Sequence, residues 1–243
     1  MRYVSRSLGI VGLFILGAVL FSARADVLTW TAAGTGDWFV VDNWTNTTTP
    51  ESTRIPADGD DAVIANAGAT VLLTHSPAVL GSLLISNATL CFSNRDTLLS
   101  ATNLTVETSG VLTCSGPFTN TAMSNRVNLA CDTLFVAAGG AINVNDKGYA
   151  GGLAIGGDTW SAGHGPGGYI GAGGSYGGGG LPAISFGARY MTNLYGSATA
   201  PLDPGSGGGI YGSVVGKRGG HGSGAICITA VQVVVNGSIS ANS

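Results

Sequence analysis

The sequence predicts an all-β protein, a right-handed parallel β-helix (β-solenoid) that follows an N-terminal signal helix and contains a long glycine-rich insertion. Three observations support this fold. Short strands of alternating apolar residues recur in the same order, 28 of the 41 glycines lie between residues 148 and 224, and an apolar segment opens the chain. A single repeat of this kind cannot bury its apolar face alone, so stacked repeats build a continuous core.

The first 25 residues have the pattern of a secretory signal peptide. Two arginines precede an apolar run over residues 8–21, and Ala23-Arg24-Ala25 is a small-residue cleavage motif. The run is about 14 residues long, whereas a membrane-spanning helix needs roughly 20, which favours cleavage over an uncleaved anchor. We therefore expect cleavage after Ala25, a mature chain that starts at Asp26 without a membrane span, and a secreted or cell-surface location.

The mature chain is acidic and poor in charge. Without the signal peptide it has 7 basic and 13 acidic residues, a net charge of −6, and charged residues make up only 9% of the whole sequence. Because phosphates repel a negative chain, we expect no nucleic-acid partner. Thr, Ser and Asn supply the polarity instead, which is typical of extracellular β proteins.

Residues 26–62 are predicted to form a tryptophan-rich cap at the N-terminal end of the solenoid. Trp30, Trp38 and Trp44 fall within 15 residues of one another. Indole rings are large and apolar and carry one N–H group, so they suit the closure of an open β core. The alternative is a surface platform on which sugar rings stack.

Residues 63–147 are predicted to be the solenoid repeats, and residues 225–243 the final one. Segments that begin at Leu83, Leu104 and Leu134 each consist of a short strand, a turn of small residues and a second strand, and a fourth begins at Val233. A parallel stack would place the three leucines in one column of the core. An antiparallel sandwich has the same alternation, but the constant order of the elements favours the parallel stack.

Residues 148–224 are predicted to be a glycine-rich insertion between the third and the last of these segments. Glycine offers no side chain to a core, so such a segment is either flexible or packed backbone against backbone. Its scattered tyrosines favour packing, because their rings can cover bare backbone. A G-x-G-x-x-G match at residues 163–168 lacks the strand-turn-helix context of a nucleotide site. We therefore expect no cofactor.

All four cysteines lie in the mature part of the chain. An even number in an exported protein is typical of disulfides, with three possible connectivities. The alternative is buried free thiols, because three of the four lie in strand-like segments. The candidate residues are Cys91, Cys114, Cys131 and Cys227.

Asp58, Asp60 and Asp61 are the candidate metal ligands of the sequence. Carboxylates at positions i and i+2 of a loop can bind Ca²⁺ through oxygen atoms. The same run also fits an ordinary turn before a strand, and this second interpretation is the one we favour. No other acidic cluster is evident, so the sequence predicts neither a catalytic site nor an enzyme.

Two stretches of the sequence resemble a known group of proteins. The first is the aromatic opening of residues 30–64, with Trp, Gly-Asp-Trp, Asn-Trp and then Gly-Asp-Asp-Ala-Val-Ile, and the second is the glycine-rich stretch of residues 205–242. These are large secreted surface proteins of environmental bacteria with autotransporter-like or pectinase-like parallel β-helices. In such proteins the repeats continue much further, so the final repeat is interpreted as truncated. The resemblance implies fold and location rather than chemistry.

We therefore expect a secreted or cell-surface structural and adhesive module without catalytic activity. Its expected partners are extracellular polysaccharide or other cell-surface components. The alternative is a polysaccharide-binding protein, or a polysaccharide-degrading one of the lyase or hydrolase kind. Degradation would require converging carboxylates beside exposed aromatic rings.

Overall fold

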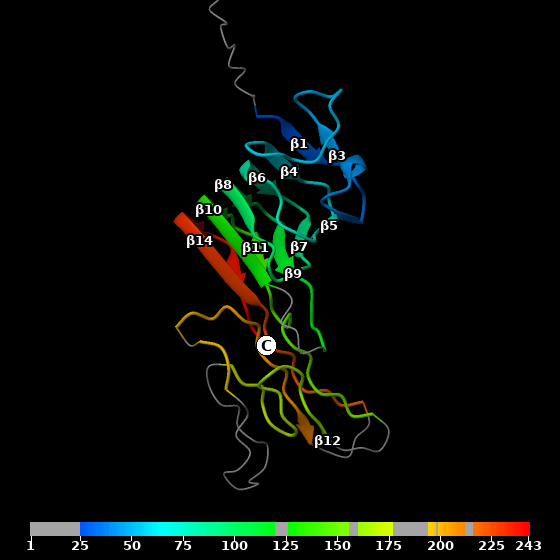
Figure 1. Ribbon diagram of the computed structural model, residues 1–243, viewed down its shortest axis with the longest axis vertical. Coiled ribbons are helices and arrows are strands. Elements are labelled where there is room, and N and C mark those ends of the chain that lie inside the picture. The colour runs from blue at the N-terminus through cyan, green and yellow to red at the C-terminus, as the bar shows by residue number, and fades with distance from the viewer. Residues whose placement is uncertain (1–24, 120–125, 156–159, 177–193, 198, 212–215) are drawn as a thin grey trace, which may run out of the picture.

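The computed structural model describes residues 25–119, 126–155, 160–176, 194–197, 199–211 and 216–243. In these residues the chain forms β-strands and one short 3-10 turn, η1 (Val41–Asn43), and no helix is long and apolar enough to cross a membrane. The strands of two main sheets are stacked along the long axis of the molecule, with the glycine-rich segment beyond them (Figure 1). The all-β prediction is confirmed. The predicted signal helix lies outside the described residues.

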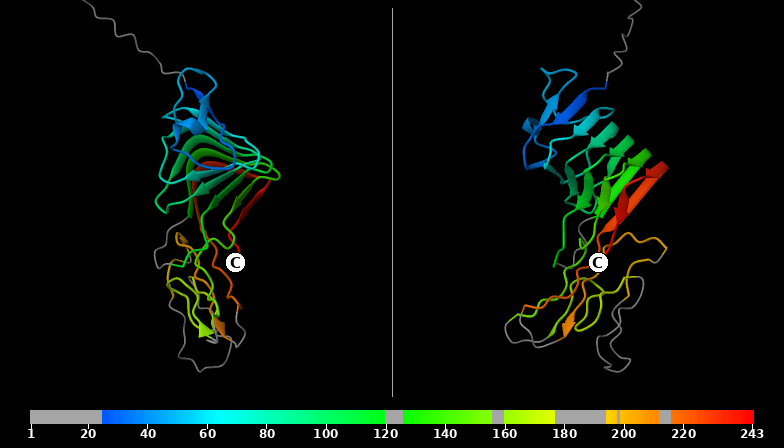
Figure 2. Two further views of the ribbon diagram at one scale, coloured as in Figure 1. Left: turned by 90° about the vertical axis from the view of Figure 1, so that its right-hand side faces the viewer. Right: turned by 180° about the vertical axis from the view of Figure 1, so that it is seen from behind.

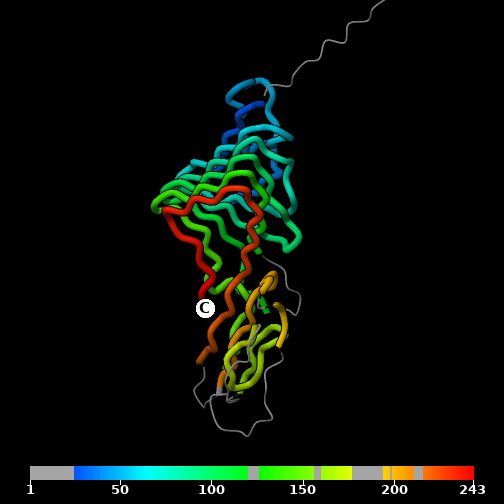
Figure 3. The backbone as a smooth tube through the Cα atoms, turned by 90° about the vertical axis from the view of Figure 1, so that its left-hand side faces the viewer, coloured from blue at the N-terminus to red at the C-terminus, as the bar shows by residue number. Residues whose placement is uncertain are grey.

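From β4 to β11, successive strands alternate between the two main sheets, whereas β3 and β4 both belong to the first of them. Sheet A has the order β14-β10-β8-β6-β4-β1-β3, and sheet B has the order β15-β11-β9-β7-β5-β2. Neighbouring strands pair in parallel, except for the antiparallel pair β1–β3 at the N-terminal end, so the antiparallel sandwich is wrong. We call a sheet-A strand together with the following sheet-B strand a repeat, and Figures 2 and 3 show how the repeats stack. The sheet-A strands are β1 (Val27–Trp30), β3 (Trp44–Asn46), β4 (Asp61–Ile64), β6 (Leu80–Ile85), β8 (Leu99–Val106), β10 (Arg126–Val136) and β14 (Ala225–Val235), and the sheet-B strands are β2 (Thr35–Asp37), β5 (Thr70–Leu73), β7 (Thr89–Phe92), β9 (Val111–Cys114), β11 (Ala141–Asn143) and β15 (Ser238–Ser240).

The core between the sheets consists of side-chain columns that run through the stack. Leu83, Leu104 and Leu134 are register partners on neighbouring strands, as predicted, and all three are buried. Each column forms because alternate residues of a strand point to the same face, and parallel pairing places equivalent residues side by side. The alternation of the sequence therefore sets both the strand faces and the register.

The long strands of sheet A bend in the middle. In β10, Leu129 and Leu134 are both buried, although five positions separate them and strict alternation would put them on opposite faces. The register to β8 is interrupted at Asp132, which lies between paired residues on either side. The bend therefore turns the strand around a corner, and the residues at the corner face outward.

The two ends of the core differ. At the N-terminal end, tryptophan side chains close the core. At the other end, Val235 lies in register with the fully buried Val136 and Val106, yet it is 43% exposed because no further strand of the described residues covers it. Val233 and Ile239 are exposed in the same way. The last repeat therefore leaves the core columns open.

The glycine-rich segment packs backbone against backbone where it is described. The amide of Gly148 donates to the carbonyl of Gly222 at 2.7 Å, and the amide of Gly152 donates to that of Gly208 at 2.9 Å. Such close approach excludes a side chain, and a Cβ atom at Gly207 would clash with the carbonyl of Ala150. A small antiparallel sheet of β12 (Trp160–Ser161) and β13 (Ile210–Tyr211) belongs to this segment.

Candidate functional site

The predicted aspartate run contributes to an ion cluster that joins the start of β1 to the start of β4. Arg54 Nη2 lies 2.8 Å from Asp26 Oδ2 and 3.0 Å from Asp60 Oδ1, while Arg54 Nη1 pairs with Asp60 Oδ2. The backbone amides of Asp26 and Ala57 also donate to Asp60, at 3.0 and 2.7 Å. We call Asp26, Arg54 and Asp60 the Arg54 cluster. The carboxylate oxygens of Asp60 are thus fully engaged within the protein.

The cluster stays charged at neutral pH. Burial alone would raise the pKa of Asp60, but hydrogen bonds from Arg54 and the two amides outweigh burial and hold it below its usual value. The pKa of Asp26 is lowered by the hydrogen bond from Asn46 and then by that from Arg54. The hydrogen bond to Asp60 in turn raises the pKa of Arg54. These groups hold the fold together rather than exchange protons.

The other two aspartates of the run have separate partners. Asp58 Oδ1 accepts a hydrogen bond from the amide of Val79 at 2.8 Å, and Asp61 Oδ1 accepts one from the hydroxyl of Ser82 at 2.6 Å. Within the described part of the chain, no group of three His, Cys, Asp or Glu side chains could hold a metal ion. The hydrogen bonds of Asp58 and Asp61 fit the turn before a strand that we favour over calcium binding.

The three predicted tryptophans lie in the core. Trp30, Trp38 and Trp44 are 2%, 0% and 1% exposed, and Trp44 meets the other two rings edge-on at centroid distances of 5.2 and 4.7 Å. The indole N–H of Trp44 donates to the carbonyl of Trp38 at 2.7 Å. Sugar stacking requires an exposed ring face, and the core covers these faces. The arrangement is that of a cap.

The four cysteines are free thiols, so the disulfide alternative for Cys91, Cys114, Cys131 and Cys227 is wrong. Cys114 is buried, and this burial raises the pKa of its thiol to about 12. Burial, and then the negative charge of Asp132, raise the pKa of Cys131. A thiol with a raised pKa remains protonated at neutral pH and is a poor nucleophile.

A groove on the outer surface of sheet A follows the bend of its long strands. It has a volume of about 430 Å³ and crosses β8, β10 and β14. We call it the lateral groove. Its rim includes Val231, which is 87% exposed. Its lining residues are Val79, Ser100, Ala101, Thr102, Ala130, Cys131, Asp132, Thr229, Ala230 and Val231.

A column of polar side chains runs beside the lateral groove. Asn103, Thr133 and Gln232 are register partners on β8, β10 and β14, and Ser82 and Asp61 continue the column on β6 and β4. We call these residues the polar column. In sequence the feature appears as a short stretch of small and mostly polar residues, such as Ser-Ala-Thr-Asn at 100–103, between two apolar half-strands. This signal could have identified the groove, but sequence reasoning missed it.

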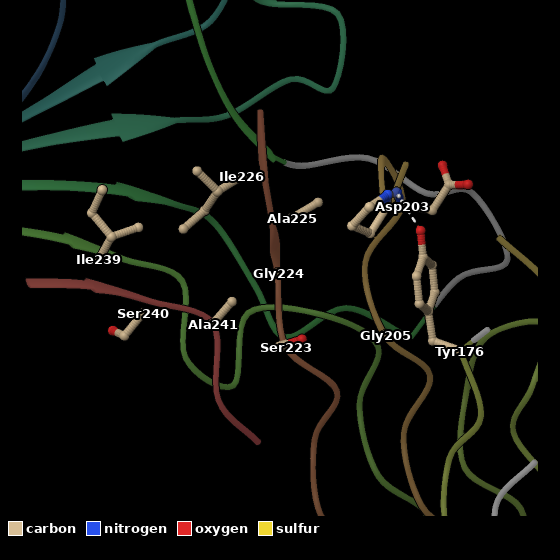
Figure 4. A pocket seen from close by; sticks show the side chains of 11 residues that line it. Tyr176, Asp203, Gly205, Ser223, Gly224, Ala225, Ile226, Ile239, Ser240 and Ala241 are labelled. Carbon is tan, nitrogen blue, oxygen red and sulfur yellow. Dashed lines mark hydrogen bonds between the residues drawn. The ribbon is translucent and has the colours of Figure 1, made fainter. Parts of the chain in front are cut away.

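A second groove, the end groove, lies where the glycine-rich segment meets the last repeat (Figure 4). It measures about 440 Å³ and has Ile226, Ile239 and Ser240 on one side and Tyr176 and Asp203 on the other. The amide of Asp203 donates to the hydroxyl of Tyr176 at 3.3 Å. Much of the groove is the open end of the core columns, so its lining is largely apolar.

Among protein families, the G8 domain model matches residues 43–131, from the end of η1 into β10. No curated protein and no solved structure matches the chain. The resemblance to autotransporter-like or pectinase-like β-helix surface proteins was therefore wrong. The family that matches is the G8 domain, and the sheets combine parallel pairs with the antiparallel pair β1–β3.

Proposed function

We propose that the repeats form a parallel β-solenoid, in which each repeat is one turn of the chain, and that this solenoid is a structural and adhesive module without catalytic activity. Alternation between the two sheets from β4 to β11 and parallel pairing of equivalent strands support the solenoid. A stack whose core is continuous from repeat to repeat is a stiff scaffold. Its outer face is then free to bind.

The lateral groove and the polar column carry the adhesive part of the proposal. Asn103, Thr133 and Gln232 present neutral amide and hydroxyl groups, which both donate and accept hydrogen bonds. Neighbouring strands lie about 4.8 Å apart, so an extended ligand along the stack meets equivalent groups at regular intervals. A neutral chain rich in hydroxyl groups, such as a polysaccharide, fits this surface best.

The composition of the lateral groove favours binding over cleavage. Asp132 is the one carboxylate among the described residues that line it, whereas most glycoside hydrolases use a pair of carboxylates. The neighbouring thiol of Cys131 has a raised pKa and remains protonated. A polysaccharide-degrading activity at this groove is therefore the weaker alternative.

The test is glycan-array binding of the purified 26–243 protein, followed by an assay for sugar release from any glycan that binds. Thr133→Ala removes a hydroxyl of the polar column, and Thr89→Ala removes a hydroxyl from the outer face of sheet B. Loss of one hydrogen bond of about 1 kcal/mol should weaken binding about fivefold in the first variant and leave the second unchanged. No binding by folded protein, or equal loss in both variants, would refute adhesion through the groove. Sugar release would refute the absence of catalysis.

The location outside the cell is part of the same proposal. It is supported by the signal pattern of residues 1–25 and by the small share of charged residues. Expression of the full chain in a bacterial host with an intact export pathway, followed by N-terminal sequencing, tests it. Recovery of protein outside the cytoplasm with Asp26 as its first residue is expected. An uncleaved chain inside the cell would contradict it.

A further inference from the structure

Among the residues that the structure describes, the Arg54 cluster has one positive charge fewer than it has negative charges. It contains two carboxylates and one guanidinium group, although the Asp60 and Asp26 side chains are only 5% and 16% exposed. Carboxylates withdrawn from water are stable when positive groups or hydrogen-bond donors replace the lost solvent. The remaining neighbours of Asp26, Asn46 and Thr49, donate hydrogen bonds but are neutral. One additional positive charge would balance the cluster.

The backbone nitrogen of Asp26 lies where that charge is needed. It is 3.0 Å from Asp60 Oδ1, and the preceding residue, Ala25, is exposed. We propose that cleavage of the bond between Ala25 and Asp26 turns this nitrogen into an α-ammonium group that completes the Arg54 cluster. An export-type endopeptidase would hydrolyse the amide with one water molecule, leaving a carboxylate on Ala25 and an ammonium group on Asp26.

The position of the cut determines whether the cluster is completed. Consecutive Cα atoms are about 3.8 Å apart, so a chain with one extra residue carries its ammonium group beyond hydrogen-bond reach of Asp60. A chain that starts one residue later lacks the Asp26 side chain, which binds Arg54 at 2.8 Å. The folded protein is therefore most stable with Asp26 as its first residue. The inference rests on the proposed export, but purified proteins test it without export.

The stabilisation depends on pH in a defined direction. The ammonium group faces the carboxylates of Asp60 and Asp26, which favour its charged form, and the guanidinium of Arg54, which opposes it. Asp61 is a further charged residue beside it, since its amide donates to the carbonyl of Asp26. Because the carboxylates attract the ammonium group more than the guanidinium repels it, the pKa of the amine in the folded state lies above its usual value of about 7.7–8.0. The added stability is then fully present below that usual value and is lost as pH rises through the folded value.

Three versions of the protein test the inference: chain 26–243 with a free amine, the same chain acetylated at Asp26, and chain 25–243. At pH 6.5, urea denaturation should show a folding equilibrium about tenfold more favourable for the free-amine chain than for the other two, equivalent to a pKa rise of about one unit. The difference should disappear at pH 10.5. Equal stability of all three chains at pH 6.5 would overturn the inference.

A second measurement avoids reliance on variants that fold poorly. The amine of Asp26 can be titrated directly by NMR after labelling with 13C-methyl groups, which preserve its charge. A pKa above the usual range is expected, and Asp58→Asn, which alters a carboxylate outside the cluster, should leave it unchanged. Asp60→Asn should lower it towards the usual range. An ordinary pKa in the folded wild-type chain would also overturn the inference.

Discussion

Truncation of Trp44 distinguishes a core cap from a surface platform. Trp44→Ala removes a ring that is 1% exposed and two edge-on contacts, to Trp30 and Trp38. Substitutions of buried tryptophan by alanine cost about 3–5 kcal/mol. The carbonyl of Trp38 also loses its donor at 2.7 Å, which adds about 1 kcal/mol, so we expect the upper part of that range.

The assay is urea denaturation followed by circular dichroism, with thermal unfolding in parallel. For a chain of this size a loss of about 4 kcal/mol lowers the Tm by roughly 10–15 °C. Trp160→Ala is the matched control, since its ring is 48% exposed, and it should cost less than about 1 kcal/mol. If Trp44→Ala lowered the free energy of unfolding by less than about 1 kcal/mol and also abolished glycan binding, the core-cap interpretation would be refuted and the sugar-stacking platform favoured.

Two further pairs of substitutions test the packing. Val106 and Val235 belong to one column of the core, but only Val235 is half-exposed. Val106→Ala should therefore lower the free energy of unfolding by about 2 kcal/mol, and Val235→Ala by less than about 1 kcal/mol. Equal losses in urea denaturation would mean that the end of the core is covered. Gly207→Ala should destabilise the protein by about 1–3 kcal/mol through overpacking, whereas a Cβ at Gly220 meets nothing within 4 Å and should be tolerated. Hydrogen exchange of the glycine-rich segment measures this second pair, and similar protection in both variants would contradict the close backbone packing.

The periodic part of the fold could be predicted because alternation acts locally. Leu83, Leu104 and Leu134 share a column since each occupies the same place in its own strand. The family could not be identified in this way. Stacked strands in general require alternating apolar residues, turns of Gly and Asn, and residues such as Thr on the outer face. These features therefore do not distinguish one family of β proteins from another.

The functional features depend on contacts that the sequence does not display. Asp60 appeared as part of an acidic run, whereas its partner Asp26 lies 34 positions earlier. The lateral groove arises from the bend between Leu129 and Leu134, where the inward-facing parity changes. A pattern analysis that assumes a straight strand interprets such a change as an interruption of the strand. The tryptophans could not be assigned from sequence either, since a buried cap and a sugar platform both need large rings with one polar atom.

The glycine-rich segment has a consequence for the order in which the molecule assembles and opens. A short connection from Phe92 to Leu99 joins two consecutive repeats. The connection to the last repeat is much longer, because the chain leaves the two main sheets after Asn143 and returns to them at Ala225. Closing the longer excursion costs about 2 kcal/mol more in chain entropy. The last repeat, whose strands β14 and β15 lie at the edges of their sheets in the described part of the chain, therefore joins late during folding and detaches first under stress. Its amides should exchange with solvent through a local opening while the repeats before it remain closed.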